Sequence, residues 1–422
     1  MVISIKNLIM MNRLLIFVFF SMLFTNGYAQ NELKLEDCIK ISKENYPLIA
    51  SFDLIEKTKS YSLDNVKKNY YPKFSATLIG GFINGLPSTN NNNDTKTELI
   101  GLAQLDQVIW DGGITKNKKK LIEAENEVKI SQLNNQLYLL EQKVSDIFFG
   151  LLLIDLKIEA LQTYKTKIKA QKKQVSSGIK NGLLPASDLT EIQIAELNIE
   201  KKEVALQSHR ETFSSILGLY MNQDLKNATL VVPEYTFTEN TNSFNRPEYK
   251  TLNSRIAALD AQENLQQSSL TPKIGIKGIA LGFSPEIGIG PASTDAILFG
   301  GLSLAWNIDA LYKNKTNKEI IAINKEQIQV EKNQLDFNLS IAERMERRNV
   351  YTYQKQVDLS KQSLNLQQKL FKSYQSQYNQ GIITIAELIR KLEDLKTAQI
   401  EVSTQKISFY KAIFNYNYIT GK

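Results

Sequence analysis

The sequence has 422 residues, of which 42% are hydrophobic, enough to bury the core of more than one domain. Its formal net charge of +7 is a modest excess spread along the chain, which does not indicate a nucleic-acid partner. The single cysteine, Cys38, excludes an intramolecular disulfide, and the single histidine, His209, excludes a His-rich metal site.

The N-terminus has the pattern of a secretory signal peptide. Two basic residues precede an apolar run over residues 14–24, and small residues follow up to Ala29. We therefore expect a signal peptide over residues 1–29, cleaved after Ala29, with translation starting at Met1 or Met11. The apolar run is too short for a membrane-spanning helix. The chain is thus predicted to be exported.

An internal repeat organises the rest of the chain. Four landmarks recur in the same order at an offset of 198 to 200 residues: "NYP" at 45–47 with "NRP" at 245–247, "YYPKF" at 70–74 with "LTPKI" at 270–274, "DGG" at 111–113 with "DAL" at 309–311, and Gly182 with Gly381. We therefore expect two copies of one unit, at residues 30–218 and 245–422, joined by an irregular connector at residues 219–244.

Both copies have the same order of expected elements: a helix, two strands, a helix of more than about 60 residues, a glycine turn and a return helix. In the first copy these are a helix at about 40–69, strands at about 74–85 and 98–109, a long helix at about 114–176 and a return helix at about 186–217. In the second copy they are a helix at about 246–270, strands at about 273–282 and 297–308, a long helix at about 311–378 and a return helix at about 384–418. The first helix of each copy should end before Pro72 or Pro272, because a residue that precedes proline disfavours helix.

The first long helix carries apolar residues in alternating steps of three and four. The unbroken series is Ile130, Leu133, Leu137, Leu140, Val144, Ile147, Leu151, Ile154, Ile158 and Leu161. This spacing predicts a coiled-coil helix of about 95 Å at 1.5 Å per residue. The same spacing returns after each glycine turn, so each copy should contain a long antiparallel helical hairpin.

The short segments alternate with a period of two, which predicts strands. In the second strand Gln104 and Asp106 share one parity, and in the third Lys273 and Lys277 oppose apolar even positions. A soluble sheet with one buried face would alternate in the same way. We favour membrane strands because all four segments have the length of a tilted spanning strand, the chain is exported, and no other segment could cover such a sheet.

Open sheet edges do not survive in lipid, so several copies of the chain would have to pool their strands. Three chains are the simplest count. The expected fold class is therefore an α+β membrane protein with two internal repeats. It combines a long α-helical coiled-coil barrel with a transmembrane β-barrel sector of four strands per chain, which gives a trimeric 12-stranded barrel.

No phosphate-binding glycine loop, nucleophile elbow or metal-binding helix motif occurs in the sequence. The lysine runs at 116–120 and 165–173 have the spacing of solvated faces on long helices. We therefore expect no enzyme activity, no catalytic residues, no cofactor, no metal site and no nucleic-acid partner.

Taken in order, these features resemble the TolC-type outer-membrane efflux proteins. The set consists of the signal peptide, the duplicated element order, "WDGG" at 110–113 where a strand meets the long helix, and the two glycine turns. Residues 33–51 also resemble the first periplasmic helix of that family. The resemblance covers essentially the whole mature chain. It implies a homotrimeric channel-tunnel, with a barrel in outer-membrane lipid and a helical tunnel that extends into the periplasm.

The resemblance also implies a partner for the glycine turns. In that family the hairpin turns dock onto a periplasmic adaptor, or membrane fusion protein, that is bound to an inner-membrane pump. The matching positions are Gly182, Leu183, Leu184 and Asp188 in the first copy, and Gly381, Ile382, Ile383 and Glu387 in the second. Glycine permits the reversal, and an exposed apolar pair is a costly patch unless a partner covers it. A turn that folds Leu184 or Ile383 inward is the alternative.

In the family, acidic residues three positions apart in the second turn form a closed periplasmic gate. The corresponding positions here are Glu387 and Arg390, followed by Lys391. A ring of Glu387 and Arg390 would be salt-bridged rather than purely anionic. The charge selectivity of the gate therefore does not follow from the resemblance.

The expected function is passive conduction through the outer membrane in a tripartite efflux system. The channel of a type I protein secretion system has the same architecture, and sequence does not separate the two. A periplasmic coiled-coil adaptor or structural protein is a third alternative. Adaptors have one hairpin flanked by compact β domains, whereas this chain has two hairpins and two strand pairs.

Overall fold

A computed structural model describes residues 32–83, 96–239, 244–284 and 295–422. The expected signal peptide and most of the two loops between paired strands lie outside the described residues.

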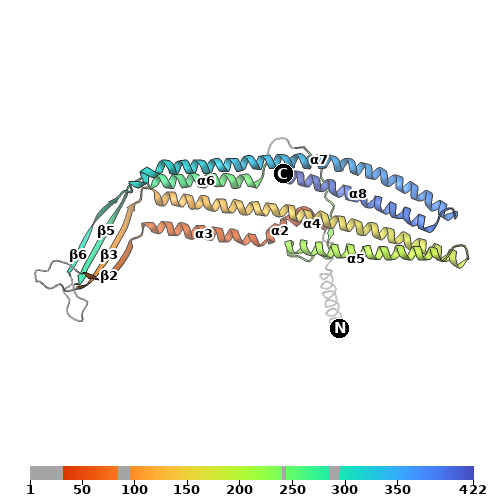
Figure 1. Cartoon of the computed structure of the whole chain (residues 1–422), viewed down its shortest axis with the longest axis horizontal. Helices are drawn as coiled ribbons and strands as arrows, with labels where there is room; N and C mark the ends of the chain where they lie inside the picture. Colours follow the sequence, from red (N-terminus) through yellow and green to blue (C-terminus); the bar gives the residue numbers. More distant parts are fainter. Residues whose placement is uncertain (1–31, 84–95, 240–243, 285–294) are drawn as a thin grey trace, which may run out of the picture. The chain divides into compact units, whose positions relative to one another are not determined.

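The described chain runs twice through one order of elements (Figure 1). The first pass consists of β1 (Glu32–Leu33), α2 (Leu35–Asn45), α3 (Ala50–Lys67), β2 (Lys73–Ile83), β3 (Lys96–Trp110), α4 (Ile114–Lys180) and α5 (Ser187–Met221). After β4 (Thr229–Leu230), the second consists of α6 (Pro247–Ser268), β5 (Lys273–Ser284), β6 (Asp295–Ala305), α7 (Asp309–Asn379) and α8 (Ile385–Thr420).

The sequence predicts one helix over residues 40–69, and this prediction is wrong. α2 ends at Asn45, a short 3-10 turn covers Pro47–Ile49, and α3 begins at Ala50. Tyr46 has the extended backbone angles φ −66° and ψ 131°, which a residue before proline prefers. Pro47 therefore divides the helix in two.

The chain forms two compact units, which we call the hairpin unit and the sheet unit and describe separately. The hairpin unit consists of the described residues within Met1–Tyr46, Leu140–Phe237 and Arg347–Phe414. The sheet unit consists of the described residues within Pro47–Leu139, Thr238–Glu346 and Asn415–Lys422. Each unit takes segments from both halves of the sequence. The two units therefore do not correspond to the two expected sequence repeats.

The sheet unit contains a four-stranded sheet of order β2-β3-β5-β6 in which every neighbouring pair is antiparallel. The ladder between β3 and β5 shifts register between Val108 and Trp110, which marks a bulge at the end of β3. β2 and β6 are the edge strands, so each has one side without a strand partner within the described chain.

Residues opposite one another on neighbouring strands share a face, so the register assigns each strand residue to one of two faces. Apolar side chains lie on both faces, but the described charges lie on only one. The face that we call uncharged includes Phe74, Ala76, Leu78, Ala103, Leu105, Ile276, Ala280, Leu298, Leu302 and Leu304. None of the described side chains on this face is charged. The face that we call charged includes Lys73, Ser75, Thr77, Gln104, Asp106, Lys273, Lys277 and Ser303.

A buried arginine, Arg246, connects three segments of the sheet unit. Its guanidinium pairs with Glu248, and its Nη1 donates to the carbonyl oxygen of Tyr418 at 3.1 Å. It also lies 4.7 Å from the ring centroids of both Tyr138 and Tyr418, which stack on each other. Arg246 thereby holds the start of α6 against α4 and the end of α8.

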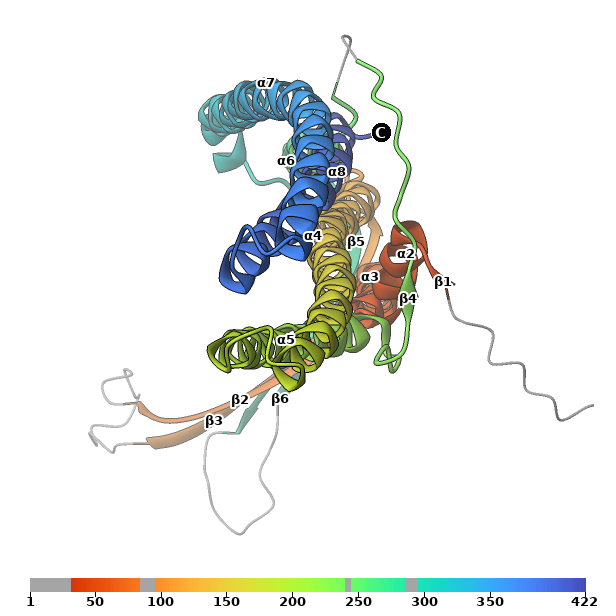
Figure 2. The same cartoon turned by 90° about the vertical axis from the view of Figure 1, so that its right-hand side faces the viewer.

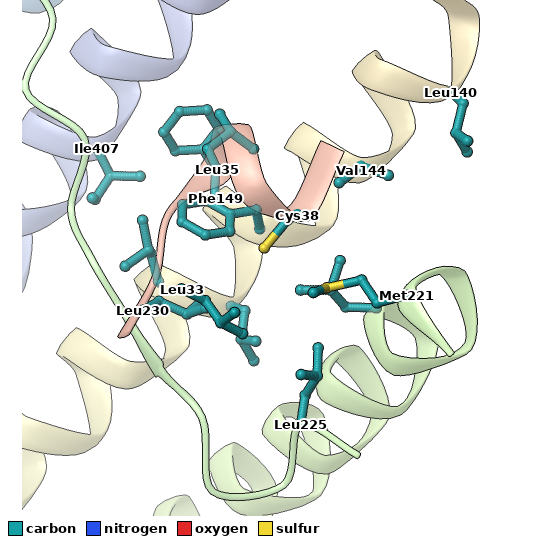
Figure 3. Packing of buried hydrophobic residues seen from close by; sticks show 14 residues of the cluster. Leu33, Leu35, Cys38, Leu140, Val144, Phe149, Met221, Leu225, Leu230 and Ile407 are labelled. Carbon is teal, nitrogen blue, oxygen red and sulfur yellow. The ribbon is translucent and has the colours of Figure 1, made fainter. Parts of the chain in front are cut away.

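The hairpin unit has an apolar core that includes its only thiol, Cys38 (Figure 3). The core takes side chains from α2, α4 and α5, among them Leu35, Phe149 and Met221. β1 pairs in parallel with β4 beside this core (Figure 2). Burial, followed by the charges of the neighbouring Asp37 and Glu36, raises the pKa of Cys38 to about 12.

Heptad positions of α4 are buried in the hairpin unit, as the alternating spacing predicts. Leu140, Val144, Leu151 and Leu161 are all buried. A second apolar cluster, which we call the turn cluster, combines Leu161, Ile168 and Val175 of α4 with Ile192, Ala195 and Ile199 of α5, Tyr378 of α7 and Ile385, Leu388, Leu392 and Leu395 of α8. Ion pairs of Lys165 with Glu203 and of Lys172 with Glu196 also join α4 to α5. Within the described ranges, no helix combines the length and the hydropathy that a membrane-spanning helix requires.

Candidate functional site

The two glycine turns, at residues 181–184 and 380–383, have the same backbone geometry. Gly182 and Gly381 have φ values of 71° and 74°. In each turn the glycine N–H bonds the carbonyl three residues earlier, and the next N–H bonds the carbonyl five residues before it, at distances between 2.8 and 3.0 Å. This is the Schellman arrangement that ends a helix. A Cβ on either glycine would meet no atom within 4 Å, so the backbone angle, not lack of space, requires glycine.

The two apolar residues that follow each glycine differ in exposure. Leu183 is 76% exposed and Ile382 is 66% exposed. Leu184 and Ile383 are half-buried and pack against the turn cluster. Each turn therefore folds its second apolar residue inward and leaves its first in solvent.

The acidic residue that follows each turn has a different environment in the two copies. Asp188 is half-buried in the first turn of α5, and burial, followed by the charge of Glu191, raises its pKa. Glu387 instead accepts the N–H of Thr384 at 3.3 Å, while the Glu387 N–H donates to the Thr384 hydroxyl at 3.3 Å. This reciprocal pair is a capping box, which the start of α5 lacks.

The predicted gate residues, Glu387 and Arg390, lie three residues apart on α8. Within the described part of this single chain they form no ion pair with each other. Lys391 pairs with Asp394 at 3.0 Å and lies 5.5 Å from the ring centroid of Tyr374.

Sequence reasoning missed an ion network beside the turn cluster in which one lysine is buried. Lys396 is almost fully buried, pairs with Glu393 at 2.9 Å and lies 4.6 Å from the ring centroid of Tyr164. Lys202 of α5 also contacts Glu393 at 2.9 Å. Hydrogen bonds from Lys202 and Lys396 lower the pKa of Glu393 to about 2. The network joins the two hairpins, and its only local signal was the spacing of three between Glu393 and Lys396.

The "WDGG" segment forms the junction between β3 and α4. Asp111 accepts the N–H of Thr115 at 2.7 Å, the N–H of Gly113 at 3.0 Å and the hydroxyl of Tyr70 at 3.0 Å. Burial raises the pKa of Asp111, but these hydrogen bonds outweigh it and leave the pKa below its ordinary value. Gly112 has φ 68°, and a Cβ there would lie 1.6 Å from the Thr271 hydroxyl. Asp111 thus caps the long helix, and the next position, Gly112, accepts only glycine.

The matching junction in the second copy is built differently. The strand predicted to reach residue 308 ends at Ala305. The indole N–H of Trp306 donates to the carbonyl oxygen of Leu270 at 2.9 Å, so this residue is held by a loop and not by a strand partner. Asp309 then begins α7 and pairs with Lys313 at 2.8 Å.

Solved outer-membrane channels have the same arrangement of helices and strands. The outer-membrane channel CmeC of Campylobacter jejuni matches with a TM-score of 0.66 and 13% identity, over 92% of this chain and 85% of that chain. The outer-membrane channel OprN matches with a TM-score of 0.66 and 12% identity, over 92% of this chain and 89% of that chain. CusC matches with a TM-score of 0.65 and 12% identity, over 94% of each chain.

This chain has the TolC-type channel fold. The predicted resemblance is confirmed at the level of the fold, since the match extends over nearly the whole chain. Neither protein-family models nor curated proteins match the sequence. The structure therefore shows the TolC-type fold. The identity to the solved channels is too low to transfer the roles of individual residues from them to this chain.

Replacing Asp111 with asparagine should destabilise the chain by about 1–2 kcal/mol at neutral pH, because a charged helix cap is lost. The folded pKa lies below the unfolded one, so the contribution of Asp111 is complete above the unfolded pKa, near 4, and disappears as the pH falls through the folded pKa. The thermal midpoints of wild type and Asp111→Asn should accordingly differ at pH 7, and the difference should shrink as the pH falls below the unfolded pKa. A difference that does not depend on pH would show that the carboxylate charge has no role in the cap.

Proposed function

We propose that this chain is the outer-membrane channel of a tripartite efflux system, in which it works as a homotrimer with a periplasmic adaptor and an inner-membrane pump. The observation that carries the proposal is the fold shared with solved outer-membrane channels over more than nine-tenths of the chain. The channel conducts passively, and the pump supplies the energy.

The chemistry of the sheet supports a place in the outer membrane. Its uncharged face has the composition of a surface in contact with lipid, and several of its side chains are strongly exposed, among them Phe74, Leu298 and Leu302. The edge strands β2 and β6 each need a partner in lipid. Three copies that pair β2 of one chain with β6 of the next would close a 12-stranded barrel.

The two glycine turns are the proposed docking sites for the adaptor. Gly182 and Gly381 set the backbone reversal, and Leu183 and Ile382 present exposed apolar side chains that a partner would cover. Leu184 and Ile383 support the turns from within, because they pack against the turn cluster. Asp188 and Glu387 begin the return helices beside these surfaces, and Glu387 with Arg390 forms the proposed periplasmic gate.

Deletion of the gene tests the proposed role. Cells without the chain should become more sensitive to toxic compounds that the associated pump exports, and expression of the wild-type chain from a plasmid should restore resistance. The chain should also be extracted by detergent from outer membranes as a heat-labile trimer. Unchanged sensitivity together with loss of a secreted protein would favour type I secretion, and a soluble periplasmic chain would exclude a channel.

A further inference from the structure

Three lysines and one aspartate gather on the charged face of the sheet, at the end nearest the helices. Lys73, Asp106 and Lys277 lie directly opposite one another on the adjacent strands β2, β3 and β5. Lys273 lies on the same face of β5, four residues before Lys277. We call these four residues the basic row.

The basic row has two more positive than negative charges. Lys277 Nζ lies 3.8 Å from Asp106 Oδ1, so these two side chains compensate each other. Lys73 and Lys273 are exposed and have no ion-pair partner within the described ranges of the chain. The excess charge of the row therefore comes from Lys73 and Lys273.

The opposite face at the same level of the sheet has the features of a lipid boundary. Phe74 and Trp110 are exposed there, and aromatic side chains of this kind gather where a membrane strand meets the lipid headgroups. A lysine on a lipid face costs about 2–4 kcal/mol near the bilayer midplane and less near the headgroups. Every described charge of the sheet lies on the other face, so we expect that face to border water in an assembled channel.

We propose that the basic row is an anion-selecting collar on the inner wall of the conduit, where the strand sector meets the helices. This inference rests on the proposed function, because only an assembled channel places the charged face around a lumen. Rings of lysine or arginine favour anions in pores, and a low-dielectric wall of one sign raises the local concentration of the opposite ion. The cargo class that the row favours is small anionic solutes, such as those that carry carboxylate or phosphate groups.

Ion selectivity in planar lipid bilayers tests the collar. Purified trimers are inserted under a gradient of potassium chloride, and the reversal potential gives the permeability ratio of chloride to potassium. The double variant Lys73→Gln and Lys273→Gln removes the two unpaired lysines and keeps the ion pair, so we expect its ratio to fall about two- to threefold. Asp106→Asn removes the only negative charge of the row and should shift the ratio in the opposite direction.

A matched control removes two lysines outside the sheet. Lys57 on α3 and Lys68, directly after the end of α3, each pair with an aspartate one turn earlier. Lys57→Gln with Lys68→Gln deletes the same charge outside the sheet and should leave the ratio near the wild-type value. If the double lysine variant and Asp106→Asn both conduct normally with an unchanged permeability ratio, the proposed collar is wrong, while the proposed channel function still stands. Wild-type trimers that form no conducting pores would overturn the proposed function, and the collar with it.

Discussion

Replacing Leu183 and Ile382 with aspartate is expected to abolish pump-dependent export while trimers still assemble. Both side chains are mostly exposed, so the substitutions remove almost no packing within the chain. They place a charge in the centre of the apolar surface that the adaptor would have to desolvate, and an unpaired buried charge at an interface is strongly unfavourable. Resistance of a deletion strain that carries the variant measures export, and migration of the unheated protein on a detergent gel measures assembly.

The half-buried neighbours make a less clear test of docking. Leu184 packs beside Gly178 and Ile383 packs against the turn cluster, so an aspartate at either position would also disturb the fold. The better control is Leu183→Met with Ile382→Met, which keeps an apolar side chain of similar size and should keep export. If trimers with both aspartates export as well as wild type, the turns are not the docking surface.

Replacing Arg246 with methionine is expected to lower the free energy of unfolding by about 3–5 kcal/mol, because it leaves Glu248 without its buried partner. The variant also loses the hydrogen bond to the Tyr418 carbonyl and the contact with two aromatic rings. Thermal unfolding of the helical circular dichroism signal, at one protein concentration for all variants, measures the change.

Arg255 provides the matched control for this prediction. It lies in α6 and pairs with Glu331, but both side chains of that pair are well exposed. An exposed pair contributes about 0–1 kcal/mol, so Arg255→Met should hardly change the midpoint. Equal effects of the two substitutions would mean that burial of the Arg246 pair does not determine its contribution.

Local chemistry explains why much of the fold can be predicted from sequence. Gly182 and Gly381 mark the turns because few other residues accept a positive φ, and the heptad spacing of α4 predicts which of its faces is buried. Alternation places Asp106 and Lys277 on defined faces of their strands. It does not reveal that β3 pairs with β5, because alternation assigns a face but not a neighbour.

The features that sequence reasoning missed depend on contacts between distant segments. Lys396 has the local surroundings of a solvated helix position, yet Tyr164 and Lys202 reach its immediate environment from other helices. Glu387 fits an acidic gate by position, but Thr384 engages it in a helix cap. The break at Pro47 was available from the sequence, since proline disfavours helix in the residue before it.

Chemical labelling of Cys38 can report local opening of the core of the hairpin unit. Thiol reagents attack the thiolate, and both the burial of this side chain and its raised pKa suppress that form in the closed core. Because the chain has a single cysteine, any alkylation must occur at this position. The rate of labelling therefore measures how often the contacts between α2, α4 and α5 separate, and it does so in the unmodified protein, with or without a bound partner.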